Sequence, residues 1–306
     1  MRILILFLIM VYSGILTAQQ EPIFTQFYVN KMIINPAVSG SSSYNLFNIQ
    51  SRQQWLGFDG APFTSNISYQ GALNNRSAMG GYMMFDQAYP SLQANFNVNY
   101  AYHIPLNNEK LNLSFGIGAK FMYYNLDFKR EELPPGNDEA FSAQSQTSFL
   151  GDASTGFFLY SKKFYLGFSS NNLLQSSYNE PVNKRFDNFL KRNYYSIFAY
   201  RFRIINNDWE LEPSFLIRKA HGFSNISDLN TRIIYLKDNW SGLSYRTDGT
   251  VIFSFGFASG NTHFSYSYDH TFKGTIQQYS YGTHELGITF KIETLATKRH
   301  IGFWQY

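Results

Sequence analysis

The chain has 306 residues, of which 19% are aromatic and only 15% are charged, and its formal net charge is +4. Soluble proteins contain about 25% charged residues, so this composition is unusual for a soluble globular protein. The small and dispersed positive charge argues against a nucleic-acid partner. The absence of cysteine excludes a disulfide scaffold, a lipid-anchored lipoprotein and any thiolate metal site.

Residues 1–18 have the layout of a secretory signal peptide. Arg2 precedes the apolar stretch 3–11, and the small residues Thr17 and Ala18 precede Gln19. A basic start, an apolar run and a small-residue cleavage site are typical of an exported protein. The apolar stretch is shorter than the roughly 20 residues that a transmembrane helix needs, which disfavours a retained membrane anchor. We expect cleavage near Ala18.

Residues 19–43 lie between this signal and the first expected strand. They contain many large apolar side chains: Ile23, Phe24, Phe27, Tyr28, Val29, Met32, Ile33 and Ile34. Towards its end the segment contains an Asn-Pro pair and a glycine, which are typical of turns. A flexible linker does not carry so many apolar groups, which need burial. We expect this segment either to pack into the lumen of a barrel or to lie in the periplasm against a partner protein.

Residues 44–306 have the pattern of a β-barrel. Between Leu111 and Phe121 the odd positions are apolar and the even positions are polar or glycine. Successive side chains of a strand point to opposite faces, so such a strand has one apolar and one polar face. Comparable segments occur at 44–52, 63–71, 78–86, 92–103, 110–127, 150–161, 164–171, 192–204, 209–219, 227–237, 240–247, 250–258, 262–273 and 281–292. The sequence therefore predicts an all-β protein, a transmembrane antiparallel β-barrel of about 14 strands in the outer membrane.

The connections between these segments are alternately short and long. The short ones lie near 161–163, 205–208, 237–239 and 259–261, and the long ones near 128–149, 172–191, 220–226 and 274–280. Outer-membrane barrels have short periplasmic turns and longer extracellular loops, which predicts both termini in the periplasm. The link near 248–249 is shorter than this pattern requires, so a strand boundary there is in doubt.

One pair of residues deserves comparison with enzymes. His263 and Ser265 share a strand face, as a His-x-Ser pair does in outer-membrane phospholipases. The pair in those enzymes faces lipid, whereas here Phe264 and Tyr266 occupy the apolar face. His263 and Ser265 are therefore expected on the polar wall of the lumen, and no catalytic residue is predicted.

No metal or cofactor is predicted either. His103, His270 and His284 lack the spacing of metal ligands. The Gly116-Ile117-Gly118 stretch lies inside a strand and not at a strand-to-helix turn, so it is not a phosphate-binding loop. Glycines at these positions are expected to relieve crowding on the lumen side.

Charged residues also fall on the polar faces of the strands. They are Lys120, Arg201, Arg203, Glu210, Glu212, Arg218, Glu285 and Lys291. One interpretation is a selectivity surface for a solute; the other is a lumen packed by mutual ion pairs. A charge on the lipid face costs roughly 2–4 kcal/mol near the midplane, so these side chains are expected inside. Their mixed signs neutralise each other instead of producing a field, which favours the packed lumen.

Several motifs resemble those of the PorP/SprF family. They are Phe24-x-Gln26-Phe27-Tyr28, Asn35-Pro36-Ala37-x-x-Gly40, Arg52-x-Gln54-Trp55-x-Gly57-Phe58, Gly60-Ala61-Pro62-Phe63-Thr64 and Ser280-Tyr281-Gly282-Thr283-His284-Glu285-Leu286. Thr283 replaces a more usual serine, which keeps the hydroxyl group. The resemblance implies an outer-membrane barrel of the type IX secretion system, which is coupled to gliding motility in Bacteroidota. It also implies three partners: outer-membrane lipids, a periplasmic secretion-ring lipoprotein and the C-terminal domain of secreted cargo or of a surface adhesin.

These motifs suggest two partner-binding surfaces. The expected periplasmic surface consists of Phe24, Gln26, Tyr28, Asn35 and Pro36, and the expected outer surface of Arg52, Gln54, Trp55 and Gly57. The alternative is that both motifs only stabilise the barrel, because buried aromatic residues usually pack against the core.

Three classes of function are compared, and a barrel enzyme is the least favoured because the sequence offers no convincing pair of nucleophile and base. The resemblance favours a non-enzymatic component of the secretion and gliding machinery. The alternative is a transporter of a small or hydrophobic solute, similar to the fatty-acid channels, which are also barrels of 14 strands. Those channels plug the lumen with an N-terminal segment longer than residues 19–43.

Overall fold

The computed structural model describes residues 22, 24–106, 110–127, 145–178, 189–205, 208–220, 225–274 and 278–293. The expected signal peptide, residues 1–18, lies outside the described residues. The strands are β1 (Asn45–Gln53), β2 (Phe63–Ala72), β3 (Ser77–Ala88), β4 (Ser91–Leu106), β5 (Leu111–Asp127), β6 (Ser145–Ser161), β7 (Phe164–Asn171), β8 (Asn193–Tyr200), β9 (Phe202–Ile205), β10 (Trp209–Ala220), β11 (Ile226–Tyr235), β12 (Asn239–Arg246), β13 (Thr250–Ser259), β14 (Thr262–Thr271) and β15 (Thr283–Ile292).

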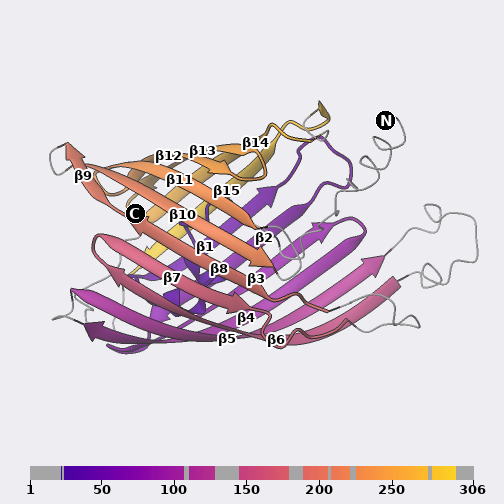
Figure 1. Cartoon of the computed structure of the whole chain (residues 1–306), viewed down its shortest axis with the longest axis horizontal. Helices are drawn as coiled ribbons and strands as arrows, with labels where there is room; N and C mark the ends of the chain where they lie inside the picture. The colour runs from indigo at the N-terminus through magenta and orange to yellow at the C-terminus, as the bar shows by residue number, and fades with distance from the viewer. Residues whose placement is uncertain are drawn as a thin grey trace, which may run out of the picture.

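These strands form one closed antiparallel barrel (Figure 1). Neighbours in sequence pair along the sheet, β1 pairs with β15, and the pairing of β10 with β11 completes the ring. Both β8 and β9 pair with β10, so they are two parts of one wall strand interrupted at Arg201. The 15 strand segments therefore occupy 14 positions in the wall, and the prediction of a barrel with about 14 strands is confirmed.

The two ends of the barrel differ in their connections. At one end, called here the short-turn end, the links are 73–76, 107–110, 162–163, 206–208, 236–238 and 260–261. At the other, the long-loop end, they are 54–62, 89–90, 128–144, 172–192, 221–225, 247–249 and 272–282. The short link at 247–249 is a tight turn between β12 and β13. The strand boundary that the sequence analysis left in doubt there is therefore present in the structure.

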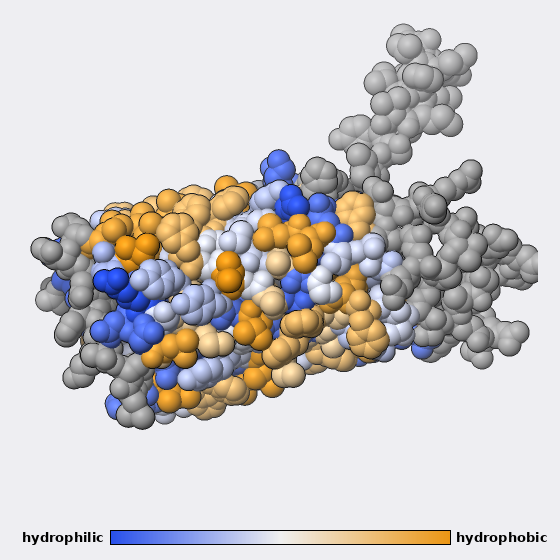
Figure 2. All heavy atoms as spheres, turned by 90° about the horizontal axis from the view of Figure 1, so that it is seen from below, coloured by the Kyte–Doolittle hydropathy of each residue, from blue (hydrophilic) through white to orange (hydrophobic). Residues whose placement is uncertain are grey.

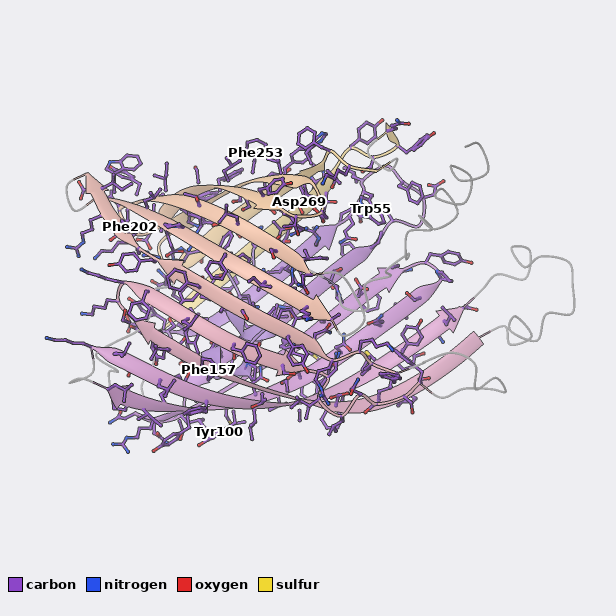
Figure 3. The ribbon with its side chains drawn as sticks, viewed as in Figure 1. Trp55, Tyr100, Phe157, Phe202, Phe253 and Asp269 are labelled. Atoms are coloured by element: carbon purple, nitrogen blue, oxygen red, sulfur yellow. The ribbon has the colours of Figure 1, made fainter. Side chains whose placement is uncertain are left out.

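The outer face of the wall is apolar. Ile67, Met83, Phe121 and Phe253 are exposed, whereas their chain neighbours Asn66, Met84, Met122 and Ile252 point inward and are buried. Figure 2 shows apolar residues over much of the visible wall, with strongly hydrophilic residues towards both its left end, the short-turn end, and its right end. Tyr100 and Phe253 project outward from opposite sides of the wall (Figure 3). This apolar exterior is the surface that an outer-membrane barrel presents to lipid.

Two short 3-10 helices, η1 (Lys31–Ile33) and η2 (Pro36–Val38), precede the first strand. Among the described residues, neither of these helices is long or apolar enough to cross a membrane. They lie inside the barrel, where Tyr28, Val38 and Ala37 join wall residues such as Phe158 and Trp240 in a buried apolar cluster. The hydrophobic core of this protein is therefore the interior of the barrel, filled by its own N-terminal segment.

Candidate functional site

The N-terminal segment occupies the lumen. Residues 24–42, called here the lumen plug, run along the inside of the wall: Thr25 contacts Arg52 towards the long-loop end, and Gly40 lies against Ala78 at the short-turn end. Phe24, Gln26 and Tyr28 are only 6%, 0% and 1% exposed. Asn35 and Pro36 are also buried. The expected periplasmic surface of these five residues is therefore wrong, because the barrel wall covers them.

A buried carboxylate holds the first turn of the plug. Glu285 on β15 accepts hydrogen bonds from the backbone N–H groups of Thr25, at 2.7 Å, and of Gln26, at 3.1 Å. Arg52 on β1 donates to the same carboxylate at 3.1 Å and to Asp269 on β14 at 2.8 Å. The Thr25 hydroxyl donates to Asp269 at 2.6 Å. Hydrogen bonds that involve ionised groups are about twice as strong as neutral ones, so this anchor is a strong one.

The middle of the plug is held by Asn35. Its side-chain oxygen caps the N–H of Ala37 at 2.9 Å, and its amide donates to the carbonyl of Phe157 at 3.0 Å. The wall is hollowed at this point by Gly116, Gly156 and Gly167, where an added Cβ would overlap Ala37 or the Asn35 side chain. Gly116 thus relieves crowding in the lumen, as the sequence analysis expected, and the crowding comes from the plug.

Tyr28 fixes the plug to the other side of the wall. Its hydroxyl donates to Ser254 on β13 at 2.9 Å, and its ring lies edge-on to Trp240 at a centroid distance of 5.3 Å. The guanidinium of Arg232 lies over the same ring at 4.3 Å, in the geometry of a cation–π contact. Strands from all parts of the barrel therefore contact the plug.

Most of the expected lumen charges are buried in ion pairs. Arg201 pairs with Glu212 at 2.6 Å and with Glu210 at 3.4 Å, and Glu212 also pairs with Arg232. Arg218 pairs with Asp228, which Arg246 contacts at 2.6 Å. Arg246 then reaches Asp269 at 3.9 Å and so connects this group to the Glu285 anchor.

Sequence reasoning missed four members of these networks. Asp228, Arg232, Arg246 and Asp269 are buried on the inner face of β11, β12 and β14. They occupy alternate positions of predicted strands, so the same alternation that identified Glu210 and Arg218 was a sufficient signal for them.

Three expected lumen charges have other environments. The Lys120 ammonium donates to Asn172 at 3.1 Å in the lumen, and Lys291 pairs with the half-buried Asp238 at 3.2 Å at the short-turn end. Arg203 is exposed at the short-turn end, where its register partner on β10 is the inward-facing Glu210, so it lies on the inner face of the wall at the rim. The wall strand expected at 192–204 is interrupted at Arg201, after which Phe202, Arg203 and Ile204 are all exposed.

The remaining motif residues meet at the long-loop end. The N–H of Trp55 donates to the Thr283 hydroxyl at 3.2 Å, the N–H of Leu56 donates to the Gly282 carbonyl at 2.8 Å, and the N–H of Tyr281 donates to the Leu56 carbonyl at 2.8 Å. Gly57, with φ +91°, lies directly under the Tyr281 ring. The 54–62 link, which begins with Gln54, is thus tied to the 272–282 link as one unit.

The described residues offer little for chemistry. No group of three or more His, Cys, Asp or Glu side chains among them is placed to hold a metal ion. His263 is buried on the inner face of β14 and lies 3.9 Å from Asp238, and the Ser265 hydroxyl faces the Gly287 carbonyl at 3.5 Å. The His263 and Ser265 side chains are therefore part of the inner wall and not of the lipid-facing surface.

Comparison with known proteins places this chain in context. A family model described as type IX secretion system membrane protein PorP/SprF matches residues 16–290. Among curated proteins, no sequence matches the chain. Among solved structures, a CymD monoaromatic hydrocarbon channel is similar, with 12% identity, 89% of this chain and 94% of that chain covered, and a TM-score of 0.54. The Pseudomonas putida toluene transporter TodX has 11% identity, coverage of 85% and 91%, and a TM-score of 0.49. At 12% identity the likeness to the CymD channel shows the outer-membrane barrel fold alone.

Proposed function

Because this chain belongs to the PorP/SprF family of type IX secretion system membrane proteins, we propose that it serves secretion as a non-enzymatic binding component and not as an open pore. The observation that carries the proposal is the lumen plug. It is held by hydrogen bonds to β1, β2, β13 and β15 and by the Asn35 contacts with β6. A lumen filled in this way supports a role in which partners bind at the two ends of the barrel.

The short-turn end is proposed to face the periplasm and to bind the secretion-ring lipoprotein. Its described exposed basic residues are Arg76, Lys110, Lys162, Lys163, Arg203 and Lys237, against the acidic residues Asp208, Asp238 and Glu293. An excess of one charge sign on a surface favours a partner of the opposite sign and speeds its encounter. The ring partner is therefore expected to present an acidic surface to this rim.

The long-loop end is proposed to hold the C-terminal domain of secreted cargo or of a surface adhesin. Leu56, Phe58, Tyr279 and Tyr281 are exposed there, on the two links that hydrogen bond to each other. Aromatic side chains on a rigid scaffold are the usual anchors of protein interfaces. In this proposal the exposed residues of the two links bind the partner, and the plug residues do not. Trp55 and Gly57 hold the two links in place.

Two matched variants test these ends. Lys162→Gln with Lys163→Gln should weaken retention of the ring lipoprotein during mild-detergent purification, while Lys219→Gln with Lys273→Gln, at the opposite end, serves as the charge control. Phe58→Ser with Tyr279→Ser should lose cargo and retain the ring protein. Mass spectrometry identifies the partners, and heat-modifiability on gels reports the folded barrel. Retention of both partners by both variants would overturn the proposal.

One observation favours a second candidate, a channel for a small hydrophobic solute. A hollow of about 660 Å³ in the outer wall is lined mainly by apolar residues of β2 to β6, among them Met83, Phe96, Phe121 and Phe149. Pockets of this size and character are typical of small-molecule sites. Uptake of a monoaromatic hydrocarbon into liposomes that contain the protein, above that of empty liposomes, would support this candidate.

A further inference from the structure

A polar cavity opens above the plug at the long-loop end. Its volume is about 330 Å³, and its floor includes Pro22, the first described residue. Its walls come from β1 to β4 and from β12 to β15, with Arg52, Trp55, Asp86 and Asp269 among the lining residues. Trp55 and Asp269 lie towards this end in Figure 3. The volume is at the lower limit of small-molecule pockets, about 300–1,000 Å³, so the cavity accepts a single side chain or a small ligand.

The charges around this cavity do not balance. Three arginines, Arg52, Arg218 and Arg246, form ion pairs with three carboxylates, which belong to Asp228, Asp269 and Glu285. Two further lining carboxylates, those of Asp86 and Asp248, form no ion pair with any described residue. The charged side chains that line the cavity are thus two arginines, Arg52 and Arg246, and three aspartates, so the lining has one carboxylate more than it has guanidinium groups.

Asp86 is the more informative of these two residues. Its side chain lies on the inner face of β3 and is only 9% exposed. One carboxylate oxygen accepts a hydrogen bond from the Thr64 hydroxyl at 2.5 Å, and the other has no hydrogen-bond partner among the described residues. A buried carboxylate without a cation is costly unless a ligand neutralises it. Asp269 also lines the cavity and has one oxygen, Oδ1, without a hydrogen bond.

The remaining lining groups suit a cationic group. Gln54, Gln93, Thr271 and Thr283 supply side-chain oxygens that accept hydrogen bonds. Trp55 adds an aromatic ring, and its backbone has φ 45°, a left-handed conformation that is strained for a residue other than glycine. Carboxylates and an aromatic ring together form the usual environment of a bound ammonium or guanidinium group.

We propose that this cavity binds the ammonium or guanidinium group of a lysine or arginine side chain, carried by a polypeptide that docks at the long-loop end. The proposal rests on the proposed function in one respect, since it gives the chemistry of the segment that the outer surface would hold. Asp86 and Asp248 supply the charge, the glutamine and threonine oxygens accept the N–H donors, and Trp55 covers the aliphatic stem.

The test uses the full-length protein purified in detergent and a fluorescent, end-capped hexapeptide that contains two lysines. Saturable binding is expected by fluorescence anisotropy, and added salt should weaken it. The double variant Asp86→Asn, Asp248→Asn should weaken binding at least about tenfold, because it removes the two lining carboxylates that would form charge-assisted hydrogen bonds to the cation. Asparagine keeps the oxygen that accepts from Thr64 and from the N–H of Thr250, so the fold is expected to persist.

Two matched controls separate this site from general attraction. Asp59→Asn removes an exposed carboxylate of the same end that does not line the cavity, and it should leave the affinity unchanged. A hexapeptide with ε-acetylated lysines should not bind. Three results would each overturn the proposal: equal binding by the double variant, binding of the acetylated peptide, and no binding by the unmodified protein. The proposal would also be overturned if millimolar Ca²⁺ bound to the cavity and displaced the peptide. Loss of cargo in cells together with intact peptide binding would instead count against the proposed function alone.

Discussion

Glu285, in the last strand of the barrel, accepts a hydrogen bond at 2.7 Å from the backbone N–H of Thr25, which precedes the first strand. The same strand, β15, pairs with β1 along nine residue pairs, from Asn45–Ile292 to Gln53–His284. Pairing of the first and last wall strands and docking of the plug therefore depend on the same strand. A buried carboxylate without its partners is strongly unfavourable, so an undocked plug would leave Glu285 and Arg52 in an unsatisfied environment.

Replacement of this carboxylate should release the plug. Glu285→Ala removes the acceptor of two backbone N–H groups and one partner of Arg52, and breaking a buried ion pair costs about 3–5 kcal/mol. We expect the plug to become sensitive to protease and the single-channel conductance in planar bilayers to rise. The control is Lys291→Met, whose partner Asp238 has a side chain 45% exposed, because ion pairs open to solvent contribute only about 0–1 kcal/mol. A protected plug and unchanged conductance in Glu285→Ala would contradict the anchor.

A single methyl group in the wall should have a related effect. In Gly116→Ala the new Cβ would overlap backbone atoms of Ala37, so the plug must move away from β5. Overpacking of this kind costs about 1–3 kcal/mol, which should appear as a lower midpoint of thermal unfolding. Gly151→Ala, in the neighbouring strand, is the control because nothing lies within 4 Å of its added Cβ. Equal midpoints for the two variants would mean that the plug does not fill the wall at Gly116.

The unmodified protein should conduct poorly. The plug and the ion pairs of Arg201, Glu212 and Arg232 occupy the lumen, so ions have no wide aqueous path. Planar-bilayer recordings of the full chain should show no stable conductance of the size that porins have. A porin-sized conductance would favour the solute-channel candidate.

Epitope tags test the orientation in the membrane. A tag at Asn137, in the 128–144 link outside the described residues, should be labelled by antibody on intact cells. A tag at Gly260, in a tight turn with open space around it, should be labelled only after the outer membrane is permeabilised. The opposite result at both sites would reverse the assignment of the ends, and with it the proposed sides of the two partners.

The sequence by itself determined the wall of this barrel. The alternation of apolar and polar residues along segments such as 111–121 predicts which side chains face lipid, because successive side chains of any strand point to opposite faces. That rule places Ile117 outside and Lys120 inside, and it also gave the number of strands and the alternation of turns and loops. The rule did not predict the interruption at Arg201, which divides the expected strand 192–204 into β8 and β9, because the alternation of the side chains continues on both sides of it.

Only the tertiary structure decided where the N-terminal segment lies. Its apolar composition required burial of Phe24 and Tyr28, and both the lumen and a partner protein satisfied that requirement. The choice depends on contacts between residues far apart in the chain: Thr25 with Glu285, Asn35 with Phe157 and Tyr28 with Ser254. Local periodicity contains no information about such contacts, because the complementary shapes and charges exist only once the wall has closed around the segment.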